Sequence, residues 1–146
     1  MGIYLNPENV DFQEVLNSKI YVDKSELIQY TNSVLRTTQK YICVSRPRRF
    51  GKSMAANMLT AYYSRGCDSR RLFQGLKIAT HPDFEKHLNQ YNVIHLNMQN
   101  FLSKTQTIEQ MIALVTKAVG RDLLRAYPDA DYLDKTILTF MLDDIY

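Results

Sequence analysis

The sequence lacks a hydrophobic run of the length that a membrane-spanning helix needs. Residues 1–15 also lack the basic and apolar segments of a secretory signal peptide. The chain starts with Met-Gly, but Asn6 stands where a myristoylation signal needs Ser or Thr. No low-complexity tract or internal repeat is present. These absences predict a cytoplasmic protein without membrane attachment.

Patterns for disulfides and metal ligands are equally scarce. Cys43 and Cys67 form no CxxC pair, and His81, His87 and His95 have no metal-ligand spacing with each other or with the cysteines. We therefore expect neither a metal site held by these residues nor a disulfide in a reducing compartment. Cys43 lies in an apolar run and is predicted to be a small core residue.

The overall charge is mild, but positive charge is concentrated in one region. The 146 residues are 45% apolar and carry a net charge of +3, which fits one domain with a substantial core. Five arginines occupy a short part of the chain, at positions Arg46, Arg48, Arg49, Arg65 and Arg70. This local excess favours an anionic ligand more than the net charge does.

Hydrophobic spacing predicts an α/β layout with few strands. The short apolar runs 40–45 and 93–98 are typical of buried strands. Helical spacing follows at 52–66 and in a long segment that starts with the capping-box pair Thr107 and Gln110. Further helices are predicted over 10–17, from Asp23 or Ser25 onward, over 82–88 and over 133–145. The expected order is helix, strand, helix, strand, helix, helix.

The segment between the first strand and its helix reads SRPRRFGKS, residues 45–53. Its second half matches the phosphate-binding loop G-x-x-x-x-G-K-[S/T], but Arg46 replaces the first glycine. Gly51 would let the backbone approach phosphates, whose oxygens need the converging amides of a loop and a helix start. Lys52 would reach the β- and γ-phosphates, and the Ser53 hydroxyl would bind Mg²⁺.

Two questions about this loop stay open: whether it binds a ligand at all, and what its two adjacent arginines do. Gly-Lys-Ser also suits an ordinary helix start in a basic loop. Arg48 and Arg49 either neutralise phosphate charge or project into solvent toward a partner or nucleic acid.

Together, YVDKSELI, KYICVS, RPRRFGKS, LFQGLKI and YNVIHLNM resemble the AAA-ATPase-like family of bacterial P-loop proteins, in which RPRRFGK[S/T] replaces the usual loop. The resemblance runs from about Val10 to the end of the chain. It implies a P-loop ATPase fold (AAA/ASCE-like), with Tyr21–Ile28 near the adenine base and often a following PD-(D/E)XK nuclease-like domain. The implied cofactors are ATP and Mg²⁺. The expected binding residues are Arg46, Pro47, Arg48, Arg49, Phe50, Gly51, Lys52, Ser53 and Met54, with Ser53 also on the metal.

A P-loop ATPase also needs an acidic (Walker B) strand that orders magnesium and activates water. Asp143-Asp144 follows an apolar run, but the four-residue spacing from Leu133 to Ile145 predicts a helix there. In the family that the chain resembles, the acidic strand also comes later. The chain is therefore interpreted as a P-loop core truncated before that strand: 1–146 would be the N-terminal part of one domain, and 1–39 the helical segment before the first strand.

Such a truncation would leave the strands 41–44 and 93–98 with unpaired edges. We expect irregular pairing, a homo-oligomer, or loosely held strands. Four functions remain open: an ATPase module completed by residues outside this chain and itself inactive in hydrolysis, a binding-only module, a nucleic-acid module that uses Arg46–Arg49, and a small-molecule kinase.

Overall fold

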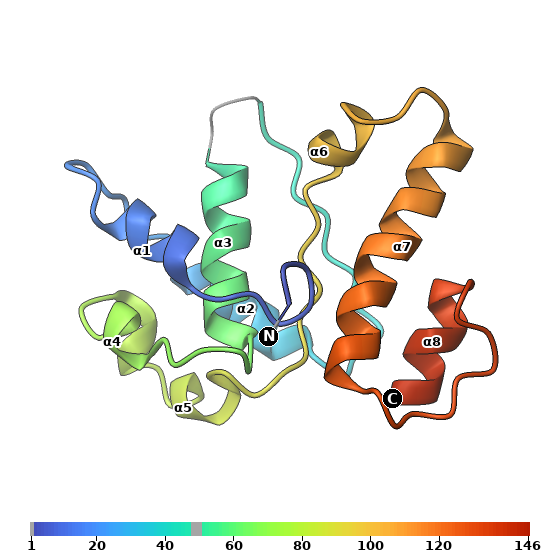
Figure 1. Ribbon diagram of the computed structural model, residues 1–146. Coiled ribbons are helices and arrows are strands. Elements are labelled where there is room, and N and C mark those ends of the chain that lie inside the picture. Colours follow the sequence, from blue (N-terminus) through green and yellow to red (C-terminus); the bar gives the residue numbers. More distant parts are fainter. Residues whose placement is uncertain (1, 48–50) are drawn as a thin grey trace. The chain divides into compact units, whose positions relative to one another are not determined.

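The computed structural model describes residues 2–47 and 51–146, which fall into two compact units. One unit is the continuous segment Glu8–Asn92. The other joins the N-terminal residues up to Pro7 with Val93–Tyr146. Each unit has its own hydrophobic core, and Figure 1 shows the helices of each.

The unit Glu8–Asn92 is built around helix α3 (Lys52–Tyr63). Its other helices are α1 (Val10–Leu16), α2 (Glu26–Val34), α4 (Arg70–Phe73), the 3₁₀ helix η1 (Lys77–Thr80) and α5 (Phe84–His87). The α3 residues Met58, Ala61 and Tyr62 share one helical face and are fully buried. They meet apolar side chains of the surrounding elements: Phe12, Ile28, Phe73, Ile78, Phe84 and Leu88.

Two tyrosines at the end of α3 join it to its neighbours by hydrogen bonds. The buried Tyr62 hydroxyl donates to the Phe84 carbonyl at 2.7 Å and accepts from the Asn32 side-chain amide at 3.2 Å. Burial raises the pKa of Tyr62 to about 12, so the hydroxyl keeps its proton at neutral pH. The Tyr63 hydroxyl donates to the other side of the Asn32 amide group. These bonds satisfy polar groups whose burial would otherwise be costly.

The second unit consists of α6 (Met98–Leu102), α7 (Ile108–Ala126), α8 (Leu138–Ile145) and the N-terminal segment. Leu5, Val119, Leu123 and Met141 form its core. The N-terminal segment is attached through the buried Asp122, whose carboxylate accepts the amides of Tyr4 at 2.7 Å and Leu5 at 3.2 Å. This carboxylate on α7 therefore fixes the start of the chain to the core of its own unit.

The helices predicted before residue 130 are confirmed by the structure, but the last helix is shorter than predicted: it was expected over 133–145, and α8 begins only at Leu138. Helix α7 begins after Thr107, whose hydroxyl accepts the Gln110 amide as the capping pattern predicts. Asp143 and Asp144 lie in α8, which confirms that the acidic pair does not end a strand. In the described part of the chain, no helix has both the length and the apolar character needed to cross a membrane.

The predicted α/β P-loop core is wrong: the described residues form no sheet and are mostly helical. β-Pairing there is limited to two isolated bridges, Leu5 with Ile94 and Ser64 with Tyr91. Residues 40–47 run without a bridge to any described residue, and 93–98 contribute Ile94 alone before α6 begins. A strand needs a neighbour that supplies its hydrogen bonds, and an apolar run does not encode that neighbour.

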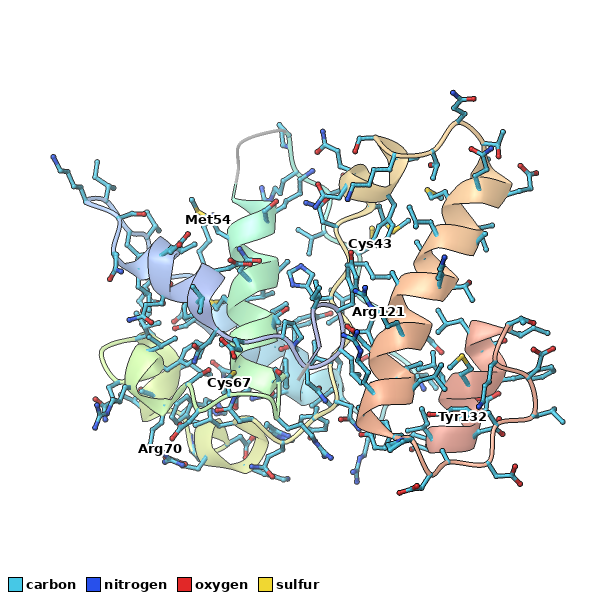
Figure 2. The ribbon with its side chains drawn as sticks, viewed as in Figure 1. Cys43, Met54, Cys67, Arg70, Arg121 and Tyr132 are labelled. Atoms are coloured by element: carbon cyan, nitrogen blue, oxygen red, sulfur yellow. The ribbon has the colours of Figure 1, made fainter. Side chains whose placement is uncertain are left out.

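Cys43 illustrates the consequence for individual side chains. It was predicted to lie in the core, but the structure shows it exposed, together with Tyr41, Ile42 and Val44. Figure 2 labels Cys43 on this extended segment. Residues 41–44 are apolar, but they belong to no sheet in the described part of the chain, and their apolar character alone does not lead to burial.

We predict that Asp122→Ala lowers the free energy of unfolding by about 2 to 4 kcal/mol, because two amides then lose their acceptor. Denaturant unfolding of the whole chain checks this. Asp131→Ala removes an exposed carboxylate and should change the unfolding free energy by less than about 0.5 kcal/mol. Equal effects of the two substitutions would contradict the anchoring role of Asp122.

Candidate functional site

Gly51 precedes α3 with a left-handed backbone, at φ 79° and ψ 22°. It is the sole described glycine with a positive φ. Its carbonyl accepts the Ala55 amide at 2.9 Å, so the helix starts at this turn. An L-residue with a Cβ reaches this conformation only with strain, and glycine avoids that strain.

The start of α3 presents amides that the helix itself does not use. The first backbone N–H groups of any helix lack acceptors within it, and here they belong to Lys52, Ser53 and Met54. Gly51 has no side chain to cap them, and the first turn contains no acidic residue. The exposed Met54 side chain is labelled on this turn in Figure 2. The helix dipole and these amides together create a local preference for an anion.

Two lysine ammonium groups lie at the same turn. The Lys52 Nζ donates to the carbonyl of Arg46 at 2.8 Å, which connects the helix start to the preceding loop. The Lys24 Nζ lies 2.7 Å from the point where a Cβ on Gly51 would be. Arg46 and Pro47 are exposed beside them. The predicted site residues Arg48, Arg49 and Phe50 lie outside the described residues.

The backbone around Lys24 is fixed by its two neighbours. The Asp23 carboxylate accepts the amides of Ser25 and Lys77, each at 2.8 Å. The buried Ser25 hydroxyl accepts the Ile78 amide at 3.1 Å, so both neighbours are bound to η1. Partial desolvation opposes ionisation of Asp23, but the hydrogen bonds from Ser25 and Lys77 outweigh it and lower the pKa of this carboxyl.

The structure separates the arginines that the sequence groups together. Arg70 forms an ion pair with Glu85, and Arg65 donates to the Gln90 carbonyl at 2.9 Å. Both guanidinium groups therefore have intramolecular partners away from Gly51. Among the described arginines, Arg46 alone lies in the loop before α3. No group of three His, Cys, Asp or Glu residues that could hold a metal occurs in the described ranges.

Spacing in the sequence located Gly51, Lys52 and Ser53, and the structure places them on consecutive positions at one helix start. The sequence spacing did not identify Lys24 as a neighbour of this turn. That proximity depends on how the segment before α2 packs against η1, and no local pattern carries this information. The resemblance placed Tyr21–Ile28 near an adenine base, a prediction that these contacts do not test.

Comparison with known proteins gives one family. The family described as Predicted AAA-ATPase matches residues 10–145, which includes Lys24 and the whole loop before α3. No curated protein and no solved structure matches the chain. This match confirms the family resemblance found in the sequence. It does not identify which residues bind a ligand.

We predict that Gly51→Ala destabilises the protein by about 1 to 2 kcal/mol, because alanine must adopt a left-handed backbone. The added Cβ would also displace the Lys24 ammonium. Gly75→Ala is the matched control, since a Cβ at Gly75 meets nothing within 4 Å and its φ lies outside the positive range. Thermal unfolding of both variants checks the prediction, and equal melting temperatures would refute the left-handed turn.

Proposed function

This chain belongs to the predicted AAA-ATPase family, and on that premise we propose that it binds ATP with Mg²⁺ at the start of α3. The observation that carries the proposal is the left-handed Gly51 at the head of α3, where it offers no side chain to cap the helix, with the ammonium groups of Lys52 and Lys24 beside it. Amides, a helix dipole and positive charge all favour a polyphosphate at one place.

Each residue of the turn has a defined role in this proposal. The amides of Lys52, Ser53 and Met54 donate to phosphate oxygens, which Gly51 allows to come close because it has no Cβ. An ammonium group has three donors, so the contact of Lys52 with the Arg46 carbonyl leaves capacity for a phosphate. The exposed Ser53 hydroxyl is available to Mg²⁺, whose charge would offset that of the phosphate oxygens.

We further propose that this chain binds ATP without measurable hydrolysis. Hydrolysis needs a carboxylate that orders Mg²⁺ and one that positions water. The acidic pair Asp143-Asp144 lies in α8, and Asp144 accepts the Leu133 amide at 2.9 Å. The first turn of α3 has no acidic residue either. These observations support a binding role for the chain and assign no residue to the activation of water.

We expect Lys52→Met to weaken binding of Mg-ATP by about 10- to 100-fold, because a charge-assisted contact is lost. Ser53→Ala should instead reduce the dependence of ATP affinity on Mg²⁺, since it removes a metal ligand and leaves the amides in place. Titration of a fluorescent ATP analogue with and without Mg²⁺ measures both effects. Lys117→Met removes an exposed charge on α7 and is the control.

The proposal fails if Lys52→Met and Lys117→Met bind Mg-ATP equally well. A parallel titration with single-stranded and duplex DNA tests the nucleic-acid alternative. Salt-dependent DNA binding that is lost in Arg46→Ala, without any ATP binding, would replace the nucleotide proposal.

A further inference from the structure

We infer that Lys24 is a second phosphate-binding cation, which contacts the polyphosphate of the nucleotide from the segment that precedes α2. The inference rests on the proposed function, because it assigns a further residue to the same site. It also fixes what that residue recognises, namely the charge of the phosphate chain and not the base.

The orientation of the Lys24 side chain is the first observation. Measured to the Cβ position of Gly51, its Nζ lies at 2.7 Å and its Cε at 3.9 Å. The charged end of the side chain, and not its aliphatic part, is therefore directed at the turn. Glycine offers no apolar side chain to pack against a lysine stem, so burial of the stem does not explain the approach.

The second observation is that the backbone on both sides of Lys24 is held in place. Asp23 and Ser25 are hydrogen-bonded to the amides of Lys77 and Ile78, and the Lys24 carbonyl accepts the Leu27 amide at 3.0 Å. The backbone at Lys24 therefore does not have to be ordered when a ligand binds. A residue fixed in this way loses less conformational freedom on binding than one in an unsupported loop.

The third argument is electrostatic. Lys24 and Lys52 bring two positive charges to one turn whose first helical positions contain no acidic residue. A polyphosphate bound at this turn is attracted to both charges. A neutral nucleoside would gain nothing from this arrangement. Lys24 should therefore increase affinity in proportion to the number of phosphates and leave binding of the base unaffected.

Calorimetric titration of the whole chain with Mg-ATP, inorganic tripolyphosphate and adenosine tests the inference. Lys24→Met should weaken binding of both Mg-ATP and tripolyphosphate by about tenfold, and should leave adenosine unchanged. Lys24→Arg keeps the charge and should recover most of the affinity. Lys19→Met removes an exposed lysine from the same unit and should bind all three probes as the unaltered chain does.

Amine acylation followed by mass spectrometry provides a test that needs no substitution. Saturating Mg-ATP should lower the reactivity of Lys24 and Lys52 at least severalfold and leave that of Lys19 unchanged. This measurement keeps the inference testable if Lys24→Met does not fold.

The outcomes separate this inference from the proposed function. If Lys52→Met loses Mg-ATP binding while Lys24→Met binds normally and Lys24 stays fully reactive, the role of Lys24 is refuted and the site stands. If the unaltered chain binds neither Mg-ATP nor tripolyphosphate, the proposed function fails, and this inference fails with it. Equal losses for adenosine and Mg-ATP would assign Lys24 to the base and overturn its assignment to phosphate.

Discussion

The left-handed backbone at Gly51 is the constraint on which the candidate site depends. This one conformation precedes the first turn of α3, whose amides have no intrahelical acceptor, and the missing side chain keeps clear the space that the Lys24 ammonium approaches. Any other residue at position 51 would add backbone strain and would compete with Lys24 for that space. Glycine at position 51 therefore allows both the left-handed backbone and the close approach of the Lys24 ammonium group.

The turn is supported by hydrophobic packing and hydrogen bonds in place of a sheet. Helix α3 is fixed by Met58, Ala61 and Tyr62 in the core of the unit Glu8–Asn92. The segment that carries Lys24 is fixed separately, through Asp23 and Ser25 on η1. Both supports belong to the same compact unit, so the two lysines are positioned by one core.

The helices could be predicted because their signals are local. Four-residue spacing predicted the helical region that contains α8, and the Thr107 cap predicted the start of α7. The strand predicted at 41–44 pairs with no described residue, because pairing depends on partners elsewhere in the chain that the run itself does not encode. The same distinction holds for the site: the motif at Gly51–Ser53 is local, whereas the position of Lys24 is a product of tertiary packing.

The backbone amide of Gly51 gives the most direct test of the account. A ¹⁵N-labelled sample titrated with Mg-ATP should show saturable shifts of the Gly51, Lys52, Ser53 and Met54 amide signals, since these groups would donate to phosphate oxygens. Adenosine at the same concentrations should leave them in place. Saturable shifts confined to other parts of the chain, with these four signals unchanged, would contradict the phosphate-binding turn.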